Sequence, residues 1–109
     1  MAIPHAQSMD VVDVRPLGSG IHSSRTATLV KTDRLELIRL VLAAGKTLPE
    51  HEVAGDITVQ CLEGNVEFRS GDVTRLLSAG QLVFLAGARK HSLRAVDDSS
   101  LLLTILLKP

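Results

Sequence analysis

From Thr26 onward the chain is a series of short runs in which apolar and polar residues alternate. The clearest run covers residues 56–63, where Ile57, Val59 and Cys61 occupy every second position. Side chains along a strand point alternately to opposite faces, so these three residues share one face. The pattern predicts a strand whose inner face is formed by Ile57, Val59 and Cys61.

Runs of the same kind recur along the rest of the sequence. Strands are predicted over residues 26–32, 35–43, 56–63, 66–69, 73–79, 81–85, 91–96 and 101–107, with a possible short edge strand at 11–15. Polar turns at 32–33, 63–65, 70–72, 79–80 and 97–100 separate them. Short strands with closely spaced glycine turns are typical of a β-sandwich or barrel. A helix competes over 34–44, but that segment lacks an N-cap pattern and lies among strands.

The chain divides into a loose arm, residues 1–24, and one β-barrel domain, residues 25–109. Residues 35–43 are apolar on both faces, which predicts a strand buried on both sides. A small barrel has only one interior to fill, so the outer face near Val30 and Leu37 should be covered by a partner chain. We therefore expect a homodimer with a two-fold arrangement, and the formal net charge of zero favours self-association.

Composition excludes some classes of function. Basic and acidic residues number 12 each and aromatic residues make up 2%, so neither a basic footprint nor a stacking platform for nucleic acid is present. Cys61 is the single cysteine and cannot form an internal disulfide, which favours a reducing compartment. The first residues do not resemble a secretory signal, and the apolar run at 101–107 is too short to span a bilayer. We expect a cytoplasmic protein that does not bind membranes.

Two segments carry recognisable motifs. The first runs from Gly45 to His51 and ends, further along, at Leu62-Glu63-Gly64; the second runs from Gly80 through Gly87 to His91. In spacing both resemble the two motifs of the cupin family. The resemblance covers residues 30–107 and implies the double-stranded β-helix, a jelly-roll barrel. It also implies that His51 and His91, which match metal-ligand positions of the family, converge at the barrel mouth.

The sequence departs from the family at the other ligand positions. The second histidine of the first motif falls on Val53, and the glutamate falls on Ile57 or Thr58, beside Asp56. Two imidazoles suit one divalent transition metal, although catalytic zinc sites usually supply three protein ligands. A third donor would have to come from water or from a nearby polar residue: Gln60, Asp56, Glu50 or Glu52. Gln60 is a weak candidate because alternation places it opposite Val59 and Cys61.

The leading hypothesis is a small-molecule-binding protein with a pocket at the barrel mouth and an optional metal. Its predicted lining is His51, His91, Val53, Ile57, Val59 and Cys61. One alternative is a metal-dependent enzyme, similar to a dioxygenase or isomerase, that uses both histidines as ligands. Another is a non-catalytic sensor or self-association domain in which the histidines only form hydrogen bonds.

Other polar residues have weaker claims to a role. Cys61 is expected to be a small core residue, with a soft metal ligand or reactive thiol as the alternative. Arg89 and Lys90 precede His91 and either attract an anionic ligand or are solvated turn charges. Arg39 and Arg94 lie within predicted strands, where a carboxylate such as Glu36 or Asp56 is expected as partner.

Overall fold

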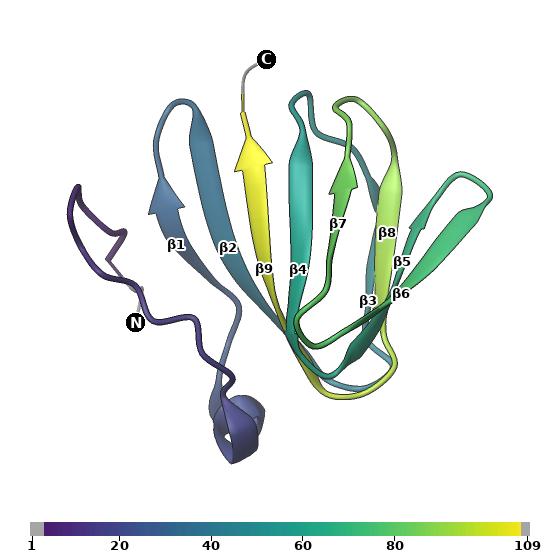
Figure 1. Cartoon of the computed structure of the whole chain (residues 1–109), viewed down its shortest axis with the longest axis horizontal. Helices are drawn as coiled ribbons and strands as arrows, with labels where there is room; N and C mark the ends of the chain where they lie inside the picture. The colour runs from purple at the N-terminus through teal and green to yellow at the C-terminus, as the bar shows by residue number, and fades with distance from the viewer. Residues whose placement is uncertain (1–3, 108–109) are drawn as a thin grey trace.

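The computed structural model describes residues 4–107 and consists almost entirely of β-strands (Figure 1). A short 3-10 helix, η1 (Gly18–Ser23), precedes the strands. The strands are β1 (Ala27–Lys31), β2 (Leu35–Leu42), β3 (Thr47–His51), β4 (Ile57–Glu63), β5 (Asn65–Ser70), β6 (Val73–Ser78), β7 (Leu82–Leu85), β8 (His91–Ala95) and β9 (Ser99–Leu106). The predicted all-β class is confirmed.

The strands form two antiparallel sheets. One has the order β1-β2-β9-β4-β7 and the other β3-β8-β5-β6. The last strand, β9, lies between β2 and β4, and its register with β2 runs from Leu35↔Leu106 to Leu42↔Ser99. Strands far apart in sequence therefore become neighbours, and the core closes only when β9 is in place.

The core lies between the two sheets and follows the predicted alternation. Ile57, Val59 and Cys61 of β4 are buried, whereas the residues between them are half-buried. The other sheet contributes the inner faces of β5 and β8. The remaining core residues are Leu40, Leu42, Val66, Phe68, Leu77, Leu93, Ala95, Leu101, Leu103 and Ile105. Because Phe68 is the only aromatic core residue, aliphatic side chains supply almost all of the apolar contact.

Gly64 allows the chain to turn from one sheet into the other. It lies between β4 and β5 with φ 87°, and a Cβ at this position would be 2.2 Å from the Ser99 hydroxyl oxygen. Only glycine adopts this conformation without strain and also leaves room for the β9 backbone. The turn predicted at 63–65 therefore also fixes how β9 enters the sheet.

The N-terminal segment lies against the five-stranded sheet without forming the strand predicted at 11–15. Residues 18–20, which were expected to belong to a loose arm, form the first half of η1 instead. A buried side-chain pair holds this segment, because the Glu63 carboxylate accepts the backbone N–H groups of Leu17 and Gly18 at 2.8 and 3.0 Å. The Arg39 guanidinium donates to the carbonyl oxygen of Arg15 and lies 3.7 Å from Glu63.

Two strands differ from those expected. Residues 47–51 form β3, an edge strand that was not predicted because Thr47, Pro49 and Glu50 leave it little apolar character. Strand β9 begins at Ser99 and not at Leu101, since the Ser99 hydroxyl is buried and hydrogen-bonded to the backbone of residues 65 and 97.

The partners of the strand arginines also differ from those expected. Arg39 pairs with Glu63, and Arg94 pairs with Glu67 at 3.2 Å. Arg94 and Glu67 are register partners on the adjacent strands β8 and β5, and Arg39 of β2 lies in the same sheet as Glu63 of β4. The proximity of each pair therefore depends on strand pairing and not on distance along the chain.

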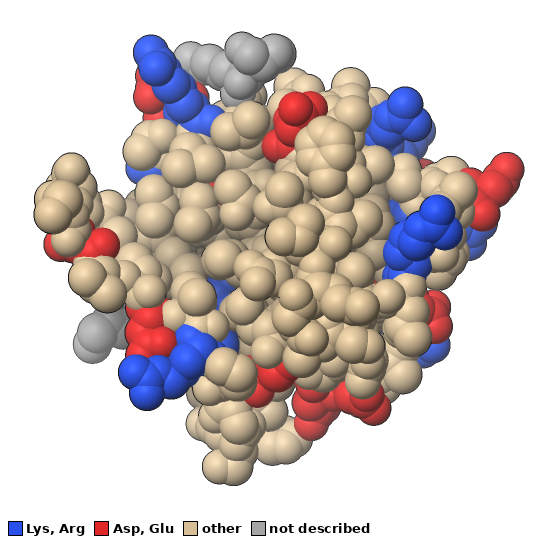
Figure 2. All heavy atoms as spheres, in the orientation of Figure 1, with Lys and Arg blue, Asp and Glu red and all other residues tan. Residues whose placement is uncertain are grey.

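The outer face of β2 is only partly covered within one chain, with Leu35, Leu37 and Val41 half-buried. On β7, Leu82 and Phe84 are 57% and 59% exposed. Figure 2 shows that charged side chains lie mainly around the margin of the face seen in Figure 1 and that its centre is uncharged. Among the residues described, no helix is long and apolar enough to span a membrane.

Candidate functional site

His51 and His91 meet where β3 and β8 run side by side. His51 is the last residue of β3 and His91 the first of β8, and they are register partners in the antiparallel ladder. His91 alternates with Leu93 and Ala95, so its side chain points inward and is only 4% exposed. His51 lies at the exposed end of the edge strand. One imidazole therefore belongs to the core and the other to its rim.

The two imidazole rings are close enough to act on one ligand. Their centroids are 4.3 Å apart and the ring planes are inclined by 60°. The Phe68 ring stacks on the His91 ring; their centroids are 5.6 Å apart and the interplanar angle is 18°. The predicted convergence of His51 and His91 is present, with an aromatic ring that packs against the inner imidazole.

Hydrogen bonds orient both rings in the same way. Nδ1 of His51 lies 3.0 Å from the carbonyl oxygen of Pro49, and Nδ1 of His91 lies 3.1 Å from that of Arg89. A carbonyl oxygen only accepts, so each Nδ1 carries the proton and donates it. In a neutral ring of this tautomer, Nε2 holds the free lone pair. The site therefore offers two Nε2 acceptors, each fixed by a backbone carbonyl.

His91 is held in its neutral form at neutral pH. Burial lowers the pKa of His91 from its ordinary value, and the neighbouring His51 acts in the same direction, while the hydrogen bond to Arg89 opposes them. Desolvation disfavours the charged imidazolium because it loses more solvation than the neutral ring. The Nε2 lone pair of His91 is thus available where an ordinary histidine would begin to protonate.

The positions that depart from the cupin motifs are apolar in the structure as well. Val53 is partly buried against the core and Ile57 is 3% exposed. The Val53 carbonyl oxygen accepts the N–H of Ala88 at 2.8 Å, which joins the loop after His51 to the loop before His91. Neither the Val53 nor the Ile57 side chain adds a donor atom to the site.

Two of the predicted site residues lie elsewhere. The Cys61 thiol is directed to the carbonyl oxygens of Glu63 and Gly64, beside the β4–β5 turn. That turn adjoins Ala95, at the opposite end of β8 from His91, so Cys61 does not line the mouth. Burial raises the pKa of the Cys61 thiol, in keeping with an inert core residue. Gln60 faces away from the interior, opposite Val59 and Cys61, and is not a ligand candidate.

The donor set falls short of a complete metal centre. In the described part of the chain, no three His, Cys, Asp or Glu side chains come together as a metal site would require. A metal held by the two imidazoles alone would take its remaining ligands from water or a bound molecule. Val59, buried at mid-strand, provides no donor either.

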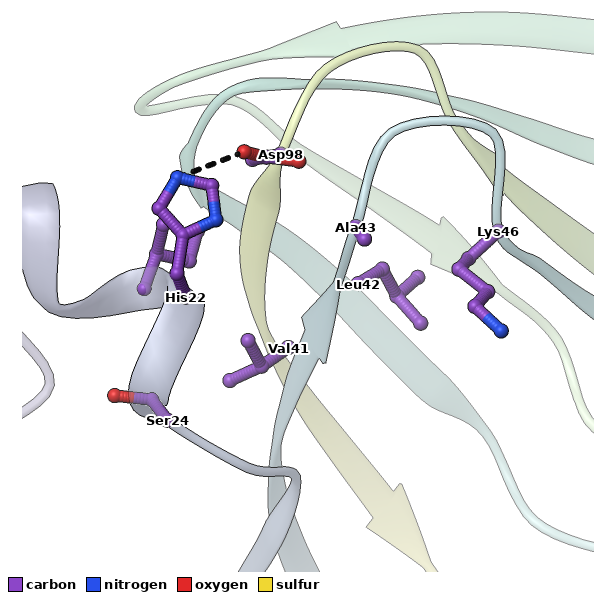
Figure 3. Close-up of a pocket in the computed structure, with 8 residues that line it drawn as sticks. His22, Ser24, Val41, Leu42, Ala43, Lys46 and Asp98 are labelled. Atoms are coloured by element: carbon purple, nitrogen blue, oxygen red, sulfur yellow. Dashed lines mark ion pairs between the residues drawn. The ribbon is translucent and has the colours of Figure 1, made fainter.

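A separate hollow of about 300 Å³ lies near η1 (Figure 3). Val41, Leu42 and Ala43 line it, and His22 contacts Asp98 there at 3.3 Å. This pairing was not predicted, because His22 lies in η1, Asp98 lies in the turn between β8 and β9, and no motif connects them. Neither His51 nor His91 is among the lining residues.

The comparisons with known proteins rest on structure alone, since no family model and no curated protein matches the sequence. A cupin superfamily protein from Desulfitobacterium hafniense superimposes with a TM-score of 0.78 at 19% identity, covering 99% of each chain. The chain has the cupin fold. A conserved Streptococcus pyogenes protein of unknown function reaches a TM-score of 0.77 at 23% identity over 100% of this chain and 96% of that one.

A third structural neighbour, an RmlC-like cupin family protein from Methanocaldococcus jannaschii, is described as having a double-stranded β-helix fold. It has a TM-score of 0.70 at 16% identity and covers 77% of this chain and 80% of its own. The fold expected from the two sequence motifs is therefore confirmed. Identities this low establish the cupin fold only, so activity has to be argued from the residues at the mouth.

Proposed function

We propose that this cupin domain binds a small organic molecule at the His51–His91 pair. The observation that carries the proposal is the common orientation of the two rings, each with Nδ1 donating to a backbone carbonyl. Such an arrangement presents two Nε2 acceptors on rings whose centroids are 4.3 Å apart. Two acceptors fixed in this way select for a ligand that donates hydrogen bonds.

The chemistry of the ligand follows from the groups around the rings. Neutral imidazole nitrogens accept from hydroxyl, N–H or protonated carboxyl groups. Phe68, which stacks on His91, and Val53, in the loop after His51, are apolar and favour a compact carbon skeleton. Arg89 and Lys90 are exposed beside His91 and favour a ligand that also bears negative charge. A small hydroxy acid, either aliphatic or phenolic, combines these features.

A divalent transition metal is the second candidate ligand. Metal-bound histidines commonly donate their second ring N–H to a carbonyl oxygen, and both imidazoles of this site do so. The two-donor set supports weak binding, with an organic molecule or water completing the coordination. The enzyme alternative requires a reaction step that these two residues do not specify, so we base the proposal on binding.

Thermal-shift titration with small hydroxy acids, phenols and carboxylic acids tests the proposal, with separate titrations of Co²⁺, Ni²⁺ and Zn²⁺ into chelator-treated protein. His51→Ala and His91→Phe should each abolish the shift, because either substitution removes one Nε2 acceptor. His22→Ala is the matched control, since that imidazole pairs with Asp98 outside the site. Binding that survives both site substitutions, or no binding by any compound or metal, would refute the proposal and favour the self-association alternative.

A further inference from the structure

The spacing of the two imidazoles depends on two loops that touch through their backbones. The loop after His51 contains Gly55, and the loop before His91 contains Gly87. A Cβ on Gly87 would lie 2.3 Å from the carbonyl oxygen of Ala54, and a Cβ on Gly55 would lie 1.7 Å from that of Leu106. Only glycine permits these approaches. Gly87 lets its loop pack against the backbone of the loop after His51, whereas Gly55 packs that loop against the last residue of β9.

Two hydrogen bonds hold these loops together. The carbonyl oxygen of Val53 accepts the N–H of Ala88, and Oδ1 of Asp56 accepts the N–H of Gly87, both at 2.8 Å. Ala88 has φ 63°, in the left-handed region that a residue with a Cβ rarely adopts. Such a conformation persists when the surrounding contacts enforce it. Here the two bonds hold the N–H groups of Ala88 itself and of the preceding residue.

The strained turn leads directly to the group that orients His91. Arg89 follows Ala88, and its carbonyl oxygen accepts the His91 Nδ1 proton at 3.1 Å. A change in the backbone at residues 87–88 would rotate that carbonyl and release the ring. Asp56 is the only side chain among the described hydrogen bonds that ties residues 86–90 to the opposite loop.

We propose that Asp56 is a positioning residue for the His51–His91 site. Through Gly87 and Ala88, its carboxylate sets the direction of the Arg89 carbonyl, and thereby the tautomer of His91 and its distance from His51. Asp56 does not touch the ligand in this scheme. The inference extends the proposed function, because it names the group that keeps the binding acceptor available.

Nitrogen-15 NMR of the ligand-free full chain tests the role of Asp56, since imidazole ¹⁵N shifts report the tautomer of each histidine. Asp56→Ala should convert His91 from a single Nδ1–H tautomer into a mixture and weaken the ring-to-ring contacts with His51. Asp56→Asn keeps an acceptor oxygen at the same position and should restore the wild-type spectrum. Asp56→Glu keeps the charge but displaces it, and should resemble Asp56→Ala.

Asp98→Ala is the matched control, because Asp98 makes the same kind of bond, 2.9 Å from the N–H of Ala44, at the other end of the barrel. It should leave the His91 tautomer unchanged. The Asp56 side chain is exposed, and the amide spectrum of each variant shows whether the fold is retained. An unaltered His91 tautomer in folded Asp56→Ala, or rescue by Asp56→Glu and not by Asp56→Asn, would overturn the positioning role. Since no ligand is needed, failure here is distinguishable from failure of the binding proposal.

Discussion

Replacing Glu63 by glutamine should destabilise the protein by about 3 kcal/mol, because it leaves the Arg39 guanidinium buried without a counter-charge. The side chains of Arg39 and Glu63 are 10% and 16% exposed, well below the exposure of surface ion pairs. Nε of Arg39 is buried and has no hydrogen-bond partner in the described structure, so the guanidinium is poorly compensated even before the change. Exposed ion pairs contribute only about 0–1 kcal/mol to stability, so the size of the loss distinguishes a buried pair from an exposed one.

Urea unfolding at neutral pH measures this loss. With an m-value of about 1.5 kcal/mol/M, a loss of about 3 kcal/mol lowers the midpoint by roughly 2 M. The Arg39→Met, Glu63→Gln double variant removes both charges and should be more stable than Glu63→Gln alone, because an apolar side chain fills the site without an unpaired charge. A loss below about 1 kcal/mol in Glu63→Gln, or no recovery in the double variant, would refute the buried-pair reasoning.

Glu63 also anchors the N-terminal segment, which gives a second measurement on the same variant. Burial alone would raise the pKa of Glu63, but hydrogen bonds from Leu17, Ser100 and Gly18, together with the charge of Arg39, hold it below its ordinary value. A carboxyl with a lowered folded-state pKa stabilises the protein above its unfolded-state value of about 4.3 and loses that contribution as pH falls. Glu63→Gln should flatten the acid limb of the stability profile.

Three further outcomes are expected. The free energy of unfolding should fall as pH drops below about 6.5, because His91 has a lowered pKa in the folded protein and the unfolded chain therefore binds the proton first. The difference in unfolding free energy between pH 7.5 and pH 5.5 should be smaller in His91→Phe than in the wild type. Cys61→Ala should cost about 1 kcal/mol and leave ligand binding intact, whereas rapid thiol labelling of the native protein would contradict its burial. We propose that the outer face of the five-stranded sheet, with half-buried Leu37 on β2 and exposed Phe84 on β7, pairs with a second copy of the chain. Sedimentation at micromolar concentration should show a dimer, and Phe84→Glu should dissociate it. A wild-type monomer would exclude this pairing.

Most of the strand pattern could be predicted because each segment carries its own two-residue alternation. The run at 56–63 matches β4, and its inner residues are those the alternation selected. Strand β3 escaped prediction because an exposed edge strand needs no apolar face, and its identity comes from pairing with β8. The segment at 11–15 had the alternation but no neighbouring strand to supply its hydrogen bonds.

For the site, the two motifs identified His51 and His91, and the spacing of their glycines implied the backbone path that brings them together. Cys61 was assigned to the mouth because alternation reports which face a residue occupies and not how far along the barrel it lies. The contacts of Asp56 and Glu63 also escaped prediction. Asp56 accepts one backbone N–H, and Glu63 accepts two in addition to its contacts with Ser100 and Arg39. Every sequence position except proline provides a backbone N–H, so such contacts leave no signature.

The sequence by itself determined most of the strands, their inner faces and the two histidines, since these follow from local periodicity and motif spacing. Only the tertiary structure decided the tautomers of the imidazoles, the lowered pKa of His91 and the loop contacts that orient it. These properties depend on burial and on hydrogen bonds between residues distant in sequence, such as Asp56 and Gly87. Such contacts exist only once both sheets have closed, because the closed barrel alone sets which backbone groups come within a few ångströms of each side chain.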